Sequence, residues 1–266
     1  MTRLVHLTDL HFGLARPDLV VPLAEAVRAV EPDLVIVSGD LVQRARTSQF
    51  QAARDFLDGL QLPWIAVPGN HDIPLFNLPA RLLHPFRAYQ QTISPELEPI
   101  LALNDLRIYG ANSVLPTAWR RGIARPSTIA RISRDMLAGP RDVTNILIFH
   151  HPFEEPPGFR KGETRHADEA LATLAGAGLH LILSGHLHHW NPAPGIDKEN
   201  ARPVLQVQNG TALCGREGER QHVFAVLDID GPDLKLTPFL AIGQPARYVP
   251  GPVTAYRRGS GGWLRL

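Results

Sequence analysis

The segment DLVIVSGD, residues 33–40, decides the fold class of this chain. Its unbroken run of apolar, mostly β-branched residues is typical of a parallel strand that is buried on both faces. The run ends at Gly39 and Asp40, so a carboxylate follows the strand directly. Parallel sheets place their functional groups at the carboxyl ends of the strands. Asp40 is therefore a candidate functional residue in an α/β fold.

The segments around this strand alternate in the same way. Apolar runs at residues 4–8 and 64–67 are predicted to be strands, and helices are predicted at 19–30 and 48–60. Either Thr47 or Ser48 is expected to be the N-cap of the second helix. The alternation of strand and helix predicts βαβ units with right-handed crossovers.

Residues 73–98 break this alternation. They contain four prolines with aromatic residues between them. We predict an irregular excursion that partly caps the site, and an ordinary long connection is the alternative. Beyond it, strands are predicted at 100–103, 107–111, 145–149, 180–183, 204–208, 223–228 and 234–238, with helices near 126–137 and from about Glu163 to 175.

The chain shows no internal repeat and no linker, which favours one domain. We place the catalytic domain at residues 1–240 and an extended C-terminal tail, rich in glycine, proline and arginine, at 241–266. This tail could add a strand to a partner or wrap its own domain. The sequence leaves the oligomeric state open.

Bulk composition excludes several classes of function. The formal net charge of +1 provides no global field that would recruit nucleic acid or an acidic membrane. Cys214 is the single cysteine, so no disulfide can form within the chain and a reducing compartment is expected. We find neither a signal-peptide pattern nor an apolar run of about 18 residues. These features together predict a cytoplasmic protein.

Ligand-type residues follow four of the other predicted strands as well. Together with Asp40 they form a set of seven: Asp9, His11, Asp40, Asn70, His150, His186 and His188. The pairs at 9 and 11 and at 186 and 188 are two residues apart, so both side chains of each pair point to one side of an extended chain. A glycine precedes three of the seven, where we expect it to let the backbone approach a bound ion or phosphate. The pattern predicts a metal centre.

The segments TDLH (8–11), SGD (38–40), GNHD (69–72), HHP (150–152) and SGHLH (184–188) carry a family resemblance. In this order they resemble the calcineurin-like metallophosphoesterase superfamily, over roughly residues 4–211. Within it, the chain is most similar to class III cyclic-nucleotide phosphodiesterases and bacterial glycerophosphodiesterases. The resemblance implies a four-layer α/β/β/α sandwich and a binuclear metal centre.

The resemblance also implies a role for each ligand. It assigns Asp9, His11 and His188 to one ion, Asn70, His150 and His186 to the other, and Asp40 to the bridge between them. His150 is favoured over His151 because the first histidine of this motif is the family's ligand. A nitrogen and oxygen ligand set without thiolate favours two divalent or mixed-valence ions of Mn, Fe, Zn or Co.

The expected reaction is hydrolysis of a phosphoester by in-line attack of a metal-bridging hydroxide. His71 is the candidate for binding phosphate, beside Asn70, and for protonating the leaving group. We further hypothesise that Asp72 orients His71 and keeps it cationic. Asn112 stands where relatives have an aspartate, and it is expected either to contact substrate or to act as a turn residue.

The expected substrate is a small phosphodiester, with 3′,5′-cyclic nucleotides first. A glycerophosphodiester or a broad range of phosphodiesters is the alternative. Protein phosphatases of the superfamily carry Asp-Arg-Gly after the bridging aspartate, and the chain has Asp40-Leu41-Val42 instead. A nuclease is disfavoured because the chain has no basic run. An inert scaffold is the least favoured reading, because none of the ligand histidines has been lost.

Overall fold

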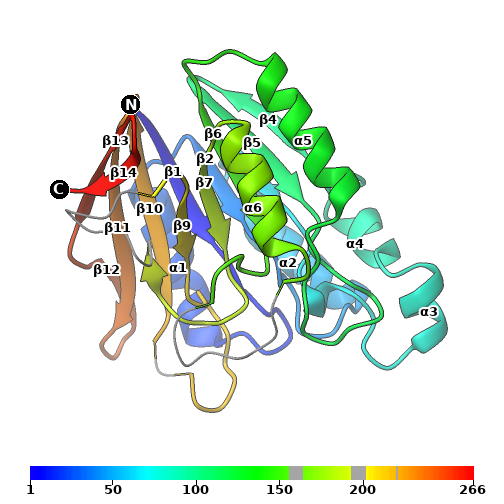
Figure 1. The fold of residues 1–266 in the computed structure, drawn as a ribbon. Helices are drawn as coiled ribbons and strands as arrows, with labels where there is room; N and C mark the ends of the chain where they lie inside the picture. The colour runs from blue at the N-terminus through cyan, green and yellow to red at the C-terminus, as the bar shows by residue number, and fades with distance from the viewer. Residues whose placement is uncertain (156–163, 193–201, 220) are drawn as a thin grey trace.

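The computed structural model describes residues 1–155, 164–192, 202–219 and 221–266. Two β-sheets face each other and helices cover their outer faces (Figure 1). The first sheet has the order β14-β13-β11-β10-β1-β2-β3, with β12 paired to β11. Its strands are β1 (Thr2–Leu7), β2 (Leu34–Val37), β3 (Trp64–Ala66), β10 (Val223–Asp230), β11 (Asp233–Ile242), β12 (Arg247–Pro250), β13 (Thr254–Gly259) and β14 (Gly262–Arg265).

The second sheet has the order β4-β5-β6-β7-β9-β8. It contains β4 (Ile100–Leu103), β5 (Leu106–Ala111), β6 (Thr144–Phe149), β7 (Leu179–Ser184), β8 (Asn191–Pro192) and β9 (Leu205–Gln208). Strands β5, β6, β7 and β9 run parallel to one another, and so do β1, β2 and β3 in the first sheet. The parallel strands of both sheets are therefore available to carry a site at their carboxyl ends.

Strand β2 shows why its sequence is apolar throughout. Val35 and Val37 pack into a core with α1 (Pro17–Ala29) and α2 (Thr47–Gly59). The alternate residues Leu34 and Ile36 pack into the core between the two sheets. A third core joins the outer face of the second sheet to α5 (Pro126–Ala138) and α6 (Ala167–Gly176). Three cores between successive layers confirm the predicted α/β/β/α sandwich.

The first residues of α2 and α6 can be compared with the predicted helix starts. Helix α2 begins at Thr47, and its N-cap is Arg46, whose backbone is extended and whose side chain makes no cap hydrogen bond. The prediction that Thr47 or Ser48 is the cap is wrong, because the backbone is already helical at Thr47. Helix α6 begins at Ala167, whereas the predicted start at Glu163 lies outside the described residues.

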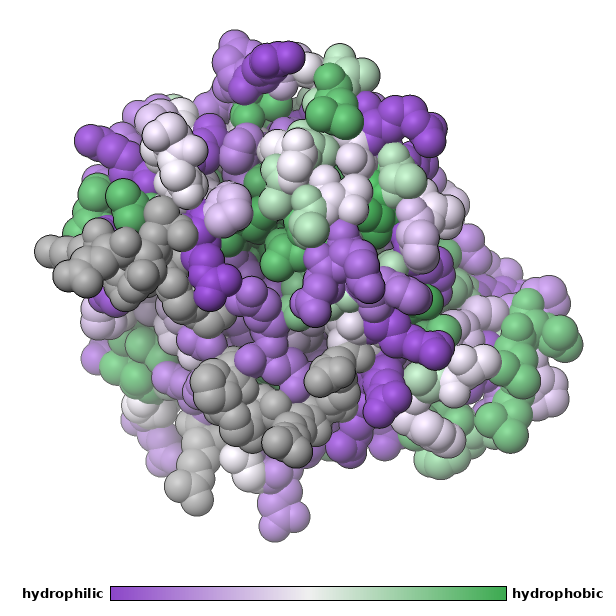
Figure 2. All heavy atoms as spheres, viewed as in Figure 1, coloured by the Kyte–Doolittle hydropathy of each residue, from purple (hydrophilic) through white to green (hydrophobic). Residues whose placement is uncertain are grey.

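The excursion at residues 73–98 is more regular than predicted. It contains α3 (Leu78–Leu83) and α4 (Arg87–Thr92). Asn77 caps α3, because its Oδ1 accepts a hydrogen bond from the Ala80 backbone N–H at 3.1 Å. Apolar side chains gather around α3 at the lower right of Figure 2. Leu83 at the end of α3 is 72% exposed, and Phe76, shortly before the helix, is 80% exposed. The expectation of an irregular segment is wrong for these two helices.

The C-terminal residues add strands to the first sheet. Strand β11 continues to Ile242, past the predicted boundary at 240, and β13 and β14 extend the sheet beyond it. Trp263 in β14 is fully buried, and its Nε1–H donates to the carbonyl oxygen of His180 in β7 at 2.9 Å. The last strand thereby joins the two sheets of its own domain. Among the described residues, no helix is both long and apolar enough to cross a membrane.

Candidate metal centre

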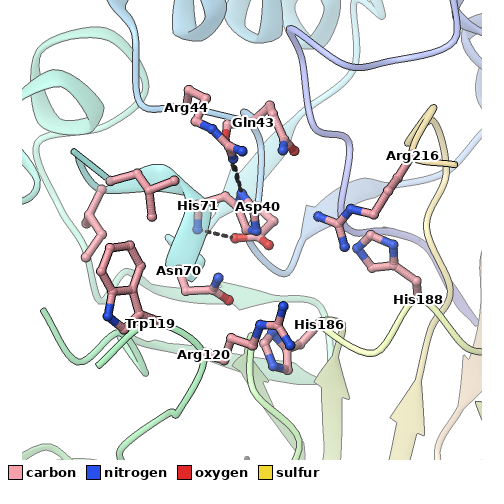
Figure 3. Close-up of a pocket in the computed structure, with 12 residues that line it drawn as sticks. Asp40, Gln43, Arg44, Asn70, His71, Trp119, Arg120, His186, His188 and Arg216 are labelled. Carbon is pink, nitrogen blue, oxygen red and sulfur yellow. Dashed lines mark hydrogen bonds between the residues drawn. The ribbon is translucent and has the colours of Figure 1, made fainter. Parts of the chain in front are cut away.

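The seven predicted ligands meet at one edge of the sandwich. Asp9 and His11 follow β1, Asp40 follows β2, Asn70 follows β3, His150 follows β6, and His186 and His188 follow β7. Both sheets therefore contribute to one cluster, and Figure 3 shows Asp40, Asn70, His186 and His188 around the same space. Six of the seven residues are at most 9% exposed. His188 is half-buried as a whole residue, but its side chain is only 4% exposed.

The first group of ligands comprises Asp9, His11 and His188. His188 Nε2 lies 3.0 Å from Asp9 Oδ1 and 3.0 Å from His11 Nε2. His11 Nε2 lies 3.6 Å from the same carboxylate oxygen. Three potential ligand atoms from two separate segments thus face one another.

The second group forms around His150. Its Nε2 lies 3.2 Å from Asn70 Oδ1 and 3.4 Å from Asp40 Oδ2. Asp40 Oδ2 also lies 3.7 Å from His11 Nε2, so one carboxylate oxygen is within reach of both groups. This is the position that a bridging ligand would need. The ring of His186 packs against that of His150, with centroids 5.3 Å apart.

These spacings fit metal ions. Ligand atoms bound at about 2.0–2.2 Å from one ion are about 3.0–3.5 Å from each other in tetrahedral or octahedral geometry. The measured separations of 3.0 to 3.7 Å are close to this range. Buried Asp9 Oδ1 also lacks a hydrogen bond with good geometry, although it is surrounded by imidazoles. The donor set therefore fits bound metal cations better than a closed hydrogen-bond network.

Backbone strain is concentrated in the same residues. In the part of the chain that the structure describes, ten non-glycine residues have positive φ, and five of them are Asp9, His11, Asp40, His186 and His188. Their φ angles of 49° to 73° lie in the left-handed region, where Asp and His are tolerated better than most residues. Such strain costs on the order of 1 kcal/mol or more per residue and clusters at functional sites. The backbone turns sharply at each strand end to aim these side chains inward.

The glycines that precede ligands serve the ligands themselves. A Cβ on Gly69 would lie 2.2 Å from Asp40 Oδ1, and one on Gly185 would lie 2.4 Å from Asp9 Oδ2. A Cβ on Gly39 would lie 2.7 Å from His150 Nδ1. We expected these glycines to give room to an ion or phosphate. In the structure they give room to neighbouring ligand side chains.

Groups behind the ligands hold two histidine rings in place. His150 Nδ1–H donates to the Ser38 carbonyl oxygen at 2.8 Å, and His188 Nδ1–H donates to Glu219 Oε1 at 2.5 Å. Such partners fix ring orientation and tautomer in metal centres and leave Nε2 for the metal. Glu219 carries no motif, and the sequence analysis missed it.

Charges inside the cluster are strongly coupled. Burial disfavours the charged ring of His188, but the carboxylate of Asp9 raises the pKa of His188 to about 11. Burial likewise opposes the charge on His150, while Asp40 raises the pKa of His150 to about 9. Burial also disfavours the charged carboxylate of Asp40, but His150 and His71 hold the pKa of Asp40 below its usual range. Protonated imidazoles thus supply the positive charge that metal ions would supply.

His71 lies beside the cluster, as predicted. Its ring meets that of His11 edge-on at 4.8 Å between centroids, and its backbone N–H donates to Asp40 Oδ1 at 2.8 Å. The predicted partner Asp72 does not orient this ring. The Asp72 carboxylate accepts from the backbone N–H groups of Gly69 and Val42 at 2.8 and 3.0 Å. His71 Nδ1 instead lies 3.0 Å from the Gln43 carbonyl oxygen, which we assign as its acceptor.

Asn112 behaves as a turn residue. Its Oδ1 accepts from the Val114 backbone N–H at 2.9 Å, two residues ahead, and its own N–H donates to Glu98 Oε1 at 3.2 Å. It is not among the residues that line the cavity at the candidate metal centre. Of the two alternatives that the sequence left open, the structure favours the turn over substrate contact.

Two further residues lie close to the cluster. The His151 ring packs against that of His186 with centroids 4.5 Å apart, and His151 Nδ1 lies 2.7 Å from Ser113 Oγ. Cys214 is buried, and its Sγ lies within 4.8 Å of ring nitrogens of His11 and His188.

The comparisons with known proteins agree with this geometry. Residues 2–190 match the model of the family described as calcineurin-like phosphoesterase. The chain belongs to the calcineurin-like phosphoesterase family. It is 28% identical, over 200 residues, to a probable cyclic nucleotide phosphodiesterase of Synechococcus sp., covering 70% of this chain and 72% of that one.

Two other similarities concern a shorter region and the fold. The chain is 36% identical over 81 residues to the glycerophosphodiester phosphodiesterase GpdQ of Enterobacter lignolyticus, covering 26% of this chain and 29% of that protein. The structure of a dimetal phosphatase from Danio rerio matches with a TM-score of 0.65 at 11% identity, covering 94% of this chain and 98% of that one. The last similarity shows the fold alone.

The centre of this calcineurin-like phosphoesterase opens into a cavity of about 400 Å³ (Figure 3). The cavity is lined by Asp40, Gln43, Arg44, Asn70, His71, Ile73, Leu75, Trp119, Arg120, His186, His188 and Arg216. Sequence reasoning missed the three arginines and Trp119. They lie on three segments that are far apart in the chain, with Trp119 and Arg120 on the same one. Only their positions after strand ends or near ligands could have marked them as cavity residues.

Proposed function

We propose that this calcineurin-like phosphoesterase is a binuclear metal-dependent phosphodiesterase that acts on small phosphodiesters. The observation that carries the proposal is the position of Asp40 Oδ2, within 3.4 Å of His150 Nε2 and 3.7 Å of His11 Nε2. One carboxylate oxygen between two groups of ligand-type side chains suits a pair of ions. Asp9, His11 and His188 would hold one ion, and Asn70, His150 and His186 the other.

When bound, such ions activate water and polarise phosphoryl oxygens. The residues of the chain would bind the phosphate and transfer the proton. If His71 is cationic and its Nδ1–H donates a hydrogen bond to the Gln43 carbonyl oxygen, its Nε2–H would be left to donate to phosphate or to protonate the leaving oxygen. Asp72 would act indirectly, since its carboxylate fixes the loop from Gly69 to His71 against residues 41–42.

Among small phosphodiesters, 3′,5′-cyclic nucleotides are our first candidates. The similarity to the Synechococcus protein, named as a probable cyclic nucleotide phosphodiesterase, extends over 70% of the chain and supports this choice. The shorter similarity to GpdQ supports glycerophosphodiesters or a broad specificity as the alternative. A cytoplasmic location and the absence of a nucleic-acid partner stay predictions from the sequence.

A substrate panel on reconstituted enzyme tests the proposal. The purified chain is loaded with Mn²⁺, its metal content is measured, and kcat/KM is determined for cAMP, 2′,3′-cAMP, glycerophosphocholine, a UDP-lipid, single-stranded DNA and bis(p-nitrophenyl) phosphate. We expect two ions per chain and turnover of at least one small phosphodiester. If cAMP trails the others by orders of magnitude, the first candidate is wrong while the metal centre stands.

A pair of matched variants controls for the role of the bridge. Asp40→Asn keeps side-chain size and the left-handed backbone but removes the negative charge. We expect it to lose metal and activity together. Asp55→Asn makes the same chemical change on the exposed surface of α2 and should retain both. An Asp40→Asn protein with full metal content and full turnover would overturn the proposal.

A further inference from the structure

Three arginines surround the mouth of the metal centre. Arg44 follows β2, Arg120 lies on the loop after β5, and Arg216 lies on the segment that follows Cys214. Figure 3 shows their guanidinium groups on three sides of the space that Asp40 lines. Among the residues that line this cavity, Asp40 is the one carboxylate, so the lining is positive even before a cation is counted.

None of these three arginines forms an ion pair among the residues that the structure describes. Arg44 donates to the Gln43 carbonyl oxygen at 2.8 Å and lies 3.4 Å from His71 Nδ1, without a carboxylate partner. Other arginines near acidic residues behave differently. Arg257, for example, pairs with Asp233 at 2.6 Å on the exposed surface. The cavity arginines are therefore available to an anionic ligand.

The loop that carries Arg120 is fixed in place by a buried residue. Arg81 of α3 is only 3% exposed, and its guanidinium donates to the carbonyl oxygens of Pro116 and Ala118 at 2.6 Å each and of Pro74 at 2.9 Å. It also lies 5.4 Å from the centroid of the Trp119 ring. Arg81 thereby clamps the loop to the excursion. This fixes the backbone just before Arg120, whose exposed side chain lines the cavity.

Charge balance indicates how many negative charges the cavity accepts. The three guanidinium groups offset the carboxylates of Asp9, Asp40 and Glu219. The charge of two divalent ions would then be left for the nucleophile and the substrate to neutralise. With one hydroxide as nucleophile, a singly charged phosphodiester would leave two positive charges uncompensated and a doubly charged diester of pyrophosphate would leave one, so the charge complementarity favours the latter.

We propose that Arg44, Arg120 and Arg216 bind a second phosphate next to the scissile one, so that the enzyme prefers diesters of pyrophosphate to singly charged phosphodiesters. Guanidinium groups bind phosphate oxygens through paired, charge-assisted hydrogen bonds. Water adds to one phosphorus and the bridging oxygen leaves with the other, so the products are two phosphate monoesters that share the protons of the water. The inference rests on the proposed phosphodiesterase function and narrows its substrate class.

A binding measurement tests the arginines separately from turnover. The full chain loaded with Mn²⁺ is titrated calorimetrically with adenosine 5′-(α,β-methylene)diphosphate, which has two phosphorus groups, and with AMP, which has one. We expect the diphosphonate analogue to bind at least ten-fold more tightly. Arg120→Ala and Arg216→Ala should each weaken its binding about ten-fold and change AMP binding much less.

The matched control is Arg121→Ala, which removes an exposed arginine next to Arg120 that does not line the cavity. It should bind both ligands as the wild type does. Equal losses for both ligands would mean that the arginines serve only the scissile phosphate, and no loss would mean that they are solvated surface residues. Either result overturns the inference.

Hydrolysis gives the second readout. For the wild type and Arg120→Ala, kcat/KM is compared between UDP-glucose and the p-nitrophenyl ester of thymidine 5′-monophosphate. The variant should lose about ten-fold more on the pyrophosphate diester than on the singly charged ester. An unchanged ratio contradicts the second phosphate site. If the loaded enzyme hydrolyses no phosphoester at all, the proposed function fails, while the binding measurement still decides the role of the arginines.

Discussion

Replacing Gly69 by alanine should disable the metal centre although no metal ligand is substituted. The added Cβ would lie 2.2 Å from Asp40 Oδ1 and 2.3 Å from the Asp40 backbone nitrogen. Real Cβ contacts below 3.0 Å are essentially absent from proteins, so the carboxylate oxygen must retreat by about 0.8 Å. Rotating the side chain does not suffice, because the backbone nitrogen is met as well.

The magnitude follows from this displacement. Metal and catalytic groups need to be within about 0.5 Å of their productive positions. A displacement of about 1 Å can cost on the order of 100-fold in rate, and we expect a loss in kcat/KM of that size together with weaker metal binding. Overpacking a closed site costs about 1–3 kcal/mol of unfolding free energy, which lowers Tm by roughly 2–10 °C in a chain of this size.

The assay combines metal analysis, turnover of bis(p-nitrophenyl) phosphate and thermal unfolding of Gly69→Ala. Gly59→Ala is the matched control, because a Cβ at this helical position meets nothing within 4 Å. That variant should keep full activity and gain about 0.5–1 kcal/mol of stability. A Gly69→Ala protein with wild-type metal content, turnover and Tm would refute the proposed packing of Asp40.

Three further variants test other parts of the structure. His71→Ala should keep its metal and lower kcat by about 10²–10⁴-fold on alkyl esters, but less on p-nitrophenyl esters, whose leaving group needs no proton; equal losses on both would contradict the role in proton donation. Arg81→Ala should lower the free energy of unfolding by about 3 kcal/mol in denaturant titrations, because three buried carbonyl oxygens lose a charged donor, whereas Arg87→Ala on exposed α4 should have no effect. Burial lowers the pKa of His6 to about 3 in the folded chain, whereas the pKa in the unfolded chain is about 6.5. Between these two values only the unfolded chain gains a proton, so the free energy of unfolding decreases by up to about 1.4 kcal/mol for each unit by which the pH is lowered. His6→Gln should remove this part of the acid sensitivity between pH 6.5 and 3, and an unchanged pH dependence of unfolding would show that His6 is not its source.

The strands that carry the site could be predicted from the sequence because their burial is two-sided. Alternate residues of β2 enter two different cores, so every position in it must be apolar, and the pattern is unambiguous. The same reasoning located the ligand-bearing strand ends, since each ligand directly follows such a run. The sheet-end geometry of parallel strands then brings these residues together.

Local features with competing explanations were harder to predict. Pro79 suggested a break, but it lies in the first turn of α3, where its missing N–H is not needed. Asp72 is next to His71 in sequence, yet the short 3₁₀ turn at 70–72 directs its carboxylate back to backbone N–H groups. The contacts of Arg81 and Glu219 depend on segments tens of residues away, and no spacing rule reveals them.

The left-handed backbone at the strand ends restricts how this centre could diverge. Asp9, His11, Asp40, His186 and His188 all occupy a conformation that few side chains tolerate, and aspartate, asparagine and histidine are the metal-binding residues best suited to it. Exchanges among these three would leave the chain path intact and alter only the charge and softness presented to the ions. Glutamate or cysteine at the same positions would raise the backbone strain. The loops thus restrict the ligands to a few residue types, and exchanges among these types can change the metal preference while the fold stays the same.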